Sequence, residues 1–326
     1  MNWNKVLLLI MIFSSTMISI SSPSWIGMWM GMEINMISFI PLMAKNKNVK
    51  MSQAMMIYFL TQSIGSLLLL FSVLMNFIVM SYFMMKLFSI LLTMSLSLKL
   101  GIAPFHMWFP EMMSNMCWPE MSMLMTWQKF APLYMLSNIT NNFMFMLIIF
   151  SSILGAIGGI NNSSIRKIMA YSSINHLSWI LMMMINQTQW IIYLLIYTIN
   201  VLMISYFFHF NNLYFINQIP NKVITLSEKF IYSSLMLSMG GMPPFMGFLP
   251  KWMAITAMIN NNMYMIIMIM ISMSLITLFY YMRIIFPLML NFNLMNKWNF
   301  NKNNKWIMTM MFINLSLPMA SIMNFY

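Results

Sequence analysis

Four charged side chains lie in the middle of long apolar stretches: Glu33, Lys99, Lys129 and Lys251. A charge at the centre of a membrane-spanning helix costs about 2.5–3.5 kcal/mol on insertion scales. None of the four is close enough to the end of its stretch to reach the aqueous interface easily. Two interpretations are open: the side chains form structural ion pairs, or they relay protons or ions. Lysine can release its proton in such a setting, whereas arginine cannot.

The stretch Lys99–Glu111 interrupts one of these apolar segments. Gly101, Pro104 and Pro110 cannot all belong to an unbroken helix, because each proline removes a backbone donor and clashes one turn back. A broken helix at membrane depth is tolerated only inside protein or beside a cavity. Transporters use such breaks to build ion paths. His106 within the break and Glu111 at its end could therefore extend a relay.

A second stretch matches the first at an offset of 140 residues. Aligning 101–111 with 241–251 superimposes four identical residues: Gly101 on Gly241, Pro104 on Pro244, Phe105 on Phe245 and Pro110 on Pro250. Three of these four matches are glycine or proline, which are scarce in this chain. The pattern predicts a duplicated unit with a broken helix in each copy. The same alignment places Glu111 opposite Lys251, so the copies differ in charge.

Composition indicates a polytopic membrane protein. The chain is 61% hydrophobic and 6% charged, with a mean hydropathy of +0.79, whereas soluble domains carry about 25% charged residues. A net charge of +12 would suggest a nucleic-acid partner in a soluble protein. Here it is expected in the loops of one membrane face, and no nucleic acid is expected. The single cysteine, Cys117, rules out a disulfide framework and a cysteine-based metal site within the chain.

The apolar runs predict about eleven transmembrane helices. The fourth and ninth contain the breaks. The spans are about 6–21, 24–44, 53–78, 83–115, 119–138, 142–160, 166–185, 189–210, 226–259, 263–287 and 306–323.

The basic residues test this arrangement. With these spans, eleven of the 16 basic residues fall on the face that holds Lys5, and Lys86 alone falls on the other. The eleven are Lys5, Lys45, Lys47, Lys50, Arg166, Lys167, Lys222, Lys229, Lys297, Lys302 and Lys305. The remaining four lie within spans, and Arg283 among them is near a span end, as an interfacial anchor would be. Such a bias predicts the N-terminus inside and the C-terminus outside.

His176 lies within the span over about 166–185, on the same turn pattern as Ser172 and Ser173. It is either a hydrogen-bonded relay station or a core histidine whose hydrogen bonds are satisfied. The sequence alone leaves both open.

Five motifs carry a resemblance to a known family. They are WIGMWMGMEIN at 25–35, KLGIAPFH at 99–106, WQKFAP at 127–132, RKIMAYSSINH at 166–176, and GGMPPF at 240–245 with Lys251. In this order, along essentially the whole chain, they resemble NADH dehydrogenase subunit 2. This is a family of mitochondrially encoded membrane subunits of respiratory complex I, within the antiporter-like proteins. The 50 methionines and the lack of aspartate are typical of a mitochondrial coding bias.

The resemblance implies an all-α fold of inverted five-helix repeats, each with a broken helix. Full-length members have fourteen helices, and animal members lack three at the N-terminus, which leaves the eleven that the apolar runs predict. The whole chain, 1–326, is then one antiporter-like membrane domain. Its approximate repeats are 1–138 and 142–287, followed by a C-terminal helix at 306–323.

The resemblance also implies roles for the charged residues. Glu33 and Lys99 correspond to the glutamate–lysine pair of the first half-channel, Lys129 to the central lysine and Lys251 to the lysine of the second. His176 falls on a polar position of the same axis. The implied activity is proton translocation within NADH:ubiquinone oxidoreductase, driven by redox chemistry in other subunits.

The resemblance implies no cofactor or metal in this chain. FMN, iron–sulfur clusters, NADH and ubiquinone are expected in partner subunits, and the partners are other membrane subunits of complex I and the lipid bilayer. The implied location is the mitochondrial inner membrane, with the N-terminus in the matrix and the C-terminus in the intermembrane space.

Two alternatives stay open. One is a self-standing cation/proton antiporter of the related family, and the other is a structural membrane scaffold. The mitochondrial coding bias disfavours the first, and the four mid-span charges disfavour the second.

Overall fold

The computed structural model describes residues 3–44, 48–78, 82–139, 141–222, 225–290 and 305–316. Within these ranges the regular secondary structure is helical, apart from an isolated bridge between Ser164 and Phe215. Six of the described helices are long and apolar enough to cross a membrane: Trp25–Met43, Val49–Asn76, Phe143–Ile160, Ile165–Ile185, Trp190–Phe210 and Tyr264–Met289. An all-helical membrane protein is therefore confirmed, and the count of about eleven spans stays a prediction.

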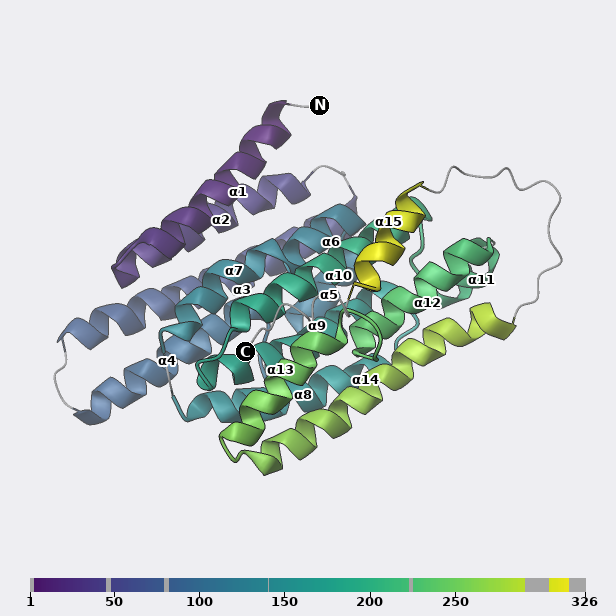
Figure 1. The fold of residues 1–326 in the computed structure, drawn as a ribbon. Helices are drawn as coiled ribbons and strands as arrows, with labels where there is room; N and C mark the ends of the chain where they lie inside the picture. Colours follow the sequence, from purple (N-terminus) through teal and green to yellow (C-terminus); the bar gives the residue numbers. More distant parts are fainter. Residues whose placement is uncertain are drawn as a thin grey trace. The chain divides into compact units, whose positions relative to one another are not determined.

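The chain divides into two compact units, Met1–Ser151 and Ser152–Tyr326, called the first and second units below. The first unit contains α1 (Trp3–Ser21), α2 (Trp25–Met43), α3 (Val49–Ile78), α4 (Tyr82–Leu100), α5 (Trp108–Asn115), α6 (Trp118–Met125), α7 (Trp127–Ser137) and the first half of α8 (Phe143–Ile160) (Figure 1). The second contains the rest of α8, then α9 (Ile165–Ile185), α10 (Trp190–Phe210), η1 (Ile216–Gln218), α11 (Ile219–Lys222), α12 (Leu226–Gly240), α13 (Phe248–Asn260), α14 (Tyr264–Leu290) and α15 (Lys305–Asn314).

In the first unit, the helices that carry Glu33, Lys99 and Lys129 (α2, α4 and α7) pack together with α1, α3 and α5. α1 packs along α2, and α3 packs along α4. α3 also contacts α2 and α5, and α7 contacts α1, α2 and α4. In the second unit, α12 packs on α10, α14 and α15, and α13 packs on α9, α10 and α14.

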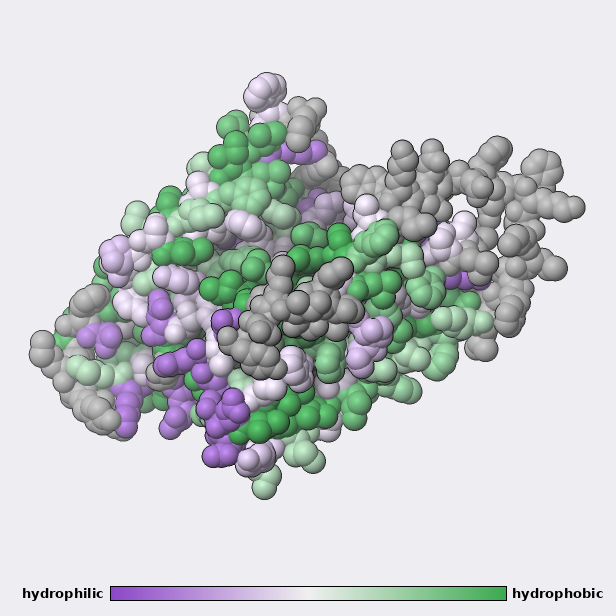
Figure 2. All heavy atoms as spheres, viewed as in Figure 1, coloured by the Kyte–Doolittle hydropathy of each residue, from purple (hydrophilic) through white to green (hydrophobic). Residues whose placement is uncertain are grey.

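Apolar side chains cover much of the outer surface, as a lipid environment favours. Leu67 on α3 is 67% exposed, and Met265 and Phe279 on α14 are 84% and 60% exposed. Figure 2 shows hydrophobic residues over much of the visible face.

Both predicted breaks are present, and the two are built alike. α4 ends at Leu100 and α12 ends at Gly240; each is followed by a glycine with left-handed backbone, at φ +71 for Gly101 and φ +77 for Gly241. The amide of each glycine donates to the carbonyl three residues back, and the next amide donates five residues back. This pair of bonds is the Schellman cap, which favours glycine because the left-handed region costs other residues energy. Helix then resumes at Trp108 and at Phe248, again 140 residues apart.

Two details differ from the predicted spans. The predicted fifth span, 119–138, is divided at Thr126 into α6 and α7, because the Thr126 backbone (φ −110, ψ −79) departs from the angles of a regular α-helix. The predicted last span, 306–323, corresponds to α15, which ends at Asn314; residues 317–323 lie outside the described residues. So do Lys45, Lys47, Lys297 and Lys302 and most of the predicted 291–305 loop.

Candidate functional site

Glu33 and Lys99 lie together in the first unit. Lys99 is in the last turn of α4, immediately before the break, and its Nζ is 3.9 Å from Oε1 of Glu33 on α2. The Lys99 side chain is buried, whereas that of Glu33 is about one-fifth exposed. At 3.9 Å the pair is a charge–charge contact that is longer than a hydrogen bond.

Side chains from α3 and α5 hold the end of α4. The last four carbonyls of a helix have no partner within it. The Gln62 amide on α3 donates to the Lys99 carbonyl at 3.0 Å, and the Trp108 indole on α5 donates to the Leu98 carbonyl at 3.1 Å. Both donors are neutral. The lysine ammonium therefore makes no contribution to these two bonds.

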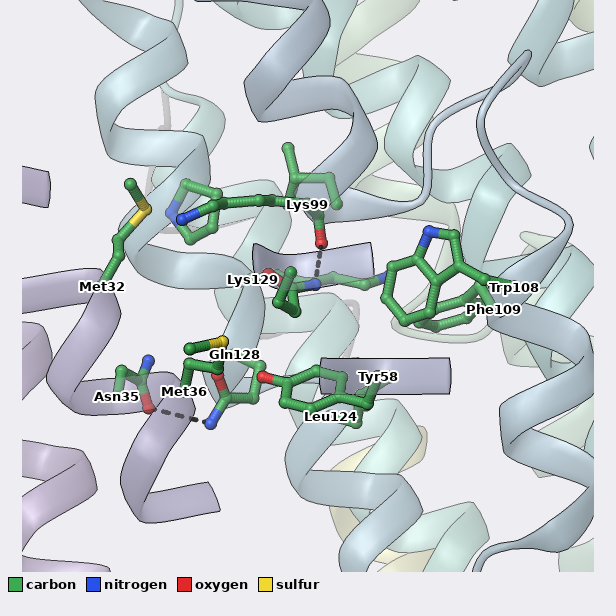
Figure 3. A pocket seen from close by; sticks show the side chains of 13 residues that line it. Met32, Asn35, Met36, Tyr58, Lys99, Trp108, Phe109, Leu124, Gln128 and Lys129 are labelled. Atoms are coloured by element: carbon green, nitrogen blue, oxygen red, sulfur yellow. Dashed lines mark hydrogen bonds between the residues drawn. The ribbon is translucent and has the colours of Figure 1, made fainter. Parts of the chain in front are cut away.

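Lys99 and Lys129 line one cavity of about 30 Å³ (Figure 3). A buried water needs roughly 10–15 Å³ of such volume and two to four polar partners, so the cavity has room for about two waters. Its polar lining includes Asn35, Tyr58, Gln62 and Gln128. The remaining lining residues are Met32, Met36, Leu100, Trp108, Phe109, Leu124 and Pro132.

Lys129 is buried on α7, at 3% exposure. Its Nζ lies 5.5 Å from the centre of the Phe109 ring on α5, within cation–π range. The neighbouring Gln128 donates to Oδ1 of Asn35 on α2 at 2.9 Å, as the dashed line in Figure 3 shows. This bond ties the start of α7 to α2 only two residues after Glu33.

Lys251 has a different partner in the second unit. It is buried on α13, and its Nζ donates to the carbonyl of Gly240, the last residue of α12, at 2.6 Å. A hydrogen bond from an ammonium is stronger than one from a neutral donor. Lys251 therefore also caps the end of α12 at the break in the second unit.

His176 is buried on α9, and its Nδ1 lies 3.0 Å from the hydroxyl of Tyr193 on α10. The Tyr197 ring is 5.0 Å from the histidine ring between centres. The hydroxyls of Ser172 and Ser173 each donate to a carbonyl one turn back in α9. The partner seen for His176 is thus a tyrosine of the next helix.

The two weaker candidates lie in different surroundings. His106 is buried in the break, with Nδ1 3.2 Å from the Pro104 carbonyl. Glu111 is exposed on α5. Although Glu111 aligns with Lys251, it does not line the cavity with Lys99 and Lys129.

The structure thus brings Glu33, Lys99 and Lys129 together in the first unit. In the second unit, Lys251 and His176 lie on α13 and α9, which pack against each other. One polar axis through both units stays a prediction.

Sequence reasoning missed the polar residues that line the cavity beside Lys99 and Lys129. Tyr58 and Gln62 lie on α3, and Asn35 and Gln128 are next to predicted site residues. Gln62 carried a usable signal, because an amide in the middle of an apolar span has to find a hydrogen-bond partner.

The model of the family described as "NADH:quinone oxidoreductase/Mrp antiporter, TM" matches residues 22–277. The fold agrees with this class. The chain is similar to one in respiratory complex I from Thermus thermophilus, with a TM-score of 0.84 and 17% identity, over 98% of this chain and 77% of that one. It is also similar to a chain of the Mrp complex from a Dietzia species, with a TM-score of 0.76 and 14% identity, over 87% and 60% of the two chains.

Individual relatives identify one family within this class of antiporter-like membrane proteins. The NADH-ubiquinone oxidoreductase chain 2 of Locusta migratoria is 40% identical over 98% of this chain and 96% of its own length. That of Bos taurus is 35% identical over 98% and 97%. The chain belongs to the NADH-ubiquinone oxidoreductase chain 2 family.

Proposed function

We propose that this chain is a core membrane subunit of proton-pumping NADH:ubiquinone oxidoreductase and that it carries protons across the membrane. Membership of the chain 2 family supports the assignment to that complex. The observation that carries the proton path is the cavity between Lys99 and Lys129, with Glu33 3.9 Å from Lys99. Buried lysines beside a cavity with room for water can pass protons on.

The Glu33–Lys99 contact gives the path a control point. Two unit charges about 4 Å apart attract by about 4 kcal/mol at an effective dielectric of 20. While Glu33 is close, Lys99 retains its proton. When the two separate by a few ångströms, the proton can leave for Lys129.

The second unit continues the relay through His176 and Lys251. Redox chemistry in other subunits drives the transfer, and this chain holds no redox site. FMN, iron–sulfur clusters, NADH and ubiquinone bind to partner subunits of the complex.

The chain has eleven membrane spans in the mitochondrial inner membrane, as two inverted five-helix repeats and a last helix within one domain. Its N-terminus is in the matrix and its C-terminus in the intermembrane space. The two breaks have the same cap bonds, and their helix ends lie 140 residues apart in sequence. This match supports the duplication. The bias of the basic residues supports the orientation.

A self-standing cation/proton antiporter is the alternative. The likeness to the Mrp complex chain concerns the fold, because the identity is 14%. Eight relatives at 33–44% identity carry the chain 2 name. These relatives favour a subunit of the oxidoreductase.

The test is Lys129→Met in the assembled complex, with protons moved per NADH oxidised as the readout. Methionine keeps the buried volume and removes the exchangeable proton. The expected result is a large loss of proton yield, whereas Lys86→Met, at an exposed position on α4, keeps the yield of the wild type. A wild-type yield from assembled Lys129→Met complex would refute the proposed path.

A further inference from the structure

Helix α3 contacts Lys99 at two points on one face, three residues apart. Gln62 donates to the backbone carbonyl of Lys99 at 3.0 Å. Gly65 lies against the aliphatic part of the Lys99 side chain. Residues three apart on a helix share a face, so one turn of α3 holds both the backbone and the side chain of this lysine.

The contact at Gly65 leaves no room for a side chain. A Cβ atom there would lie 2.9 Å from Lys99 Cγ and 3.4 Å from both Lys99 Cε and Leu98 Cδ2. Carbon atoms make favourable contact at about 3.5–4.0 Å. A methyl group would therefore displace the lysine side chain near its base, and the displacement would reach Nζ.

Helix stability alone does not account for a glycine here. Gly65 is buried in the interior of a 30-residue helix, where glycine is less favourable than alanine by about 1 kcal/mol. The space taken by Lys99 favours glycine, and the stability of α3 favours alanine. The two effects have opposite signs, so an experiment can separate them.

We propose that Gly65 is a positioning residue for proton transfer: with Gln62 it fixes the Lys99 side chain so that the ammonium lies beside Glu33 and the cavity. This inference rests on the proposed function, because it gives Lys99 a role in the proton path. In Figure 3 the Lys99 side chain extends toward α2, the helix that carries Met32 and Asn35. The Gly65 contact lies at the base of that side chain, where a small shift changes its direction.

The second unit has a related contact. A Cβ at Gly241 would lie 2.6 Å from Lys251 Cδ. Gly241 also has left-handed backbone, so a substitution there would change two things at once. Gly65 is therefore the cleaner position for a test.

The experiment is Gly65→Ala in the assembled complex, with protons moved per NADH and the amount of assembled complex measured together. A misplacement of about 1 Å can slow a transfer up to roughly 100-fold. Since slower transfer at Lys99 passes fewer protons on, the expected result is a normal amount of complex whose proton yield per NADH falls below the wild-type value. Assembled Gly65→Ala complex with wild-type yield would overturn the proposal.

Two further variants make the result specific. Ser63→Ala changes the same helix two residues away, where the hydroxyl donates to the Leu60 carbonyl of α3 itself; it should pump normally. Lys129→Met separates the positioning role of Gly65 from the proton path itself. If it loses proton yield while Gly65→Ala does not, the positioning role is wrong and the proton path stands. If neither loses yield, the path itself is wrong.

A pair of variants covers loss of assembly. If Gly65→Ala reduces the amount of complex, the Gly65→Ala, Lys99→Ala double variant is compared with Lys99→Ala alone. Lys99→Ala removes Cγ and Cε, the two Lys99 atoms that the new methyl group would meet, and leaves the 3.4 Å approach to Leu98 Cδ2. Equal amounts of the two complexes would show that the conflict is with the lysine side chain, as proposed. Less of the double variant would show that Gly65 serves helix packing, and the proposal would be overturned.

Discussion

At the scale of single residues, Lys129 combines burial with a proton that can be released. It lies on α7 beside the cavity, with the Phe109 ring 5.5 Å away. An arginine at the same place would retain a positive charge and the cation–π contact, but it would not give up its proton. Charge and proton exchange can therefore be separated at this one position.

We predict that Lys129→Arg reduces proton yield nearly as much as Lys129→Met does, because a relay station must lose its proton. The measurement is protons moved per NADH in complexes matched for assembled amount. Wild-type yield in an assembled Lys129→Arg complex would show that positive charge alone is sufficient.

A substitution at Glu33 distinguishes two roles of the Glu33–Lys99 pair: a brace, which only holds two helices together, and a switch, which controls proton release. Glu33→Gln keeps the shape and removes the charge that faces Lys99 at 3.9 Å. As a switch, the pair predicts that Glu33→Gln assembles and oxidises NADH while proton transfer falls. Loss of assembled subunit with normal pumping in the remainder would indicate a brace.

The exchanged pair, Glu33→Lys with Lys99→Glu, is the matched control for that comparison. A brace needs only opposite charges, so the exchange would restore assembly and function. A switch needs the lysine at the end of α4, beside the cavity, so the exchange would leave pumping impaired.

At the scale of helices, the sequence was most informative where glycine and proline are concentrated. The glycines and prolines of 101–110 and of the matching stretch 241–250 predicted both breaks, because proline cannot continue a helix. The left-handed caps at Gly101 and Gly241 were seen only in the structure. The Gln62–Lys99 bond could not be predicted in the same way. It joins residues 37 apart in sequence, and its register depends on how α3 packs along α4. Thr126 carries no strong helix-breaking signal, so the division between α6 and α7 was missed.

Arg283 shows a similar limit. Its position near a span end predicted an interfacial anchor, and the structure shows it partly buried on α14, donating to the carbonyls of Ile160 and Asn162. These carbonyls lie at and just beyond the end of α8, where intrahelical donors are lacking. The guanidinium fork thus ties α14 to the end of α8.

We predict that Arg283→Lys recovers only part of the stability lost in Arg283→Met, since one ammonium does not reproduce the two-point fork. Each hydrogen bond to a charged group contributes about 1.5–3 kcal/mol. The measurement is the temperature at which the purified complex loses NADH oxidation. A lysine variant as stable as the wild type would contradict the role of the fork.

At the scale of the whole molecule, the positions of the basic residues predict the orientation in the membrane. Lys50 is the second residue of α3, and Lys86 is near the start of α4, which packs along α3. A helix rises about 1.5 Å per residue, so a 30-residue helix is about 45 Å long and exceeds the apolar core of a bilayer. Lys50 and Lys86 are therefore expected on opposite membrane faces.

We predict that Lys50→Cys is labelled from the matrix side and Lys86→Cys from the intermembrane side. Both positions are exposed, and Cys117→Ser removes the natural thiol. The measurement is reaction with a membrane-impermeant maleimide in intact mitochondria without outer membrane and in inverted vesicles. Labelling of both cysteines from one side would refute the topology.

The bond from Lys251 to the Gly240 carbonyl has a consequence for genetics. At Lys99, neutral side chains hold the helix end, so a missense change there removes a charge and leaves the donors in place. At Lys251, one missense change removes a charge and a structural donor together. The same substitution at Lys99 and at Lys251 therefore has different structural effects. A more severe phenotype at 251 would not show that the second half of the protein moves more protons.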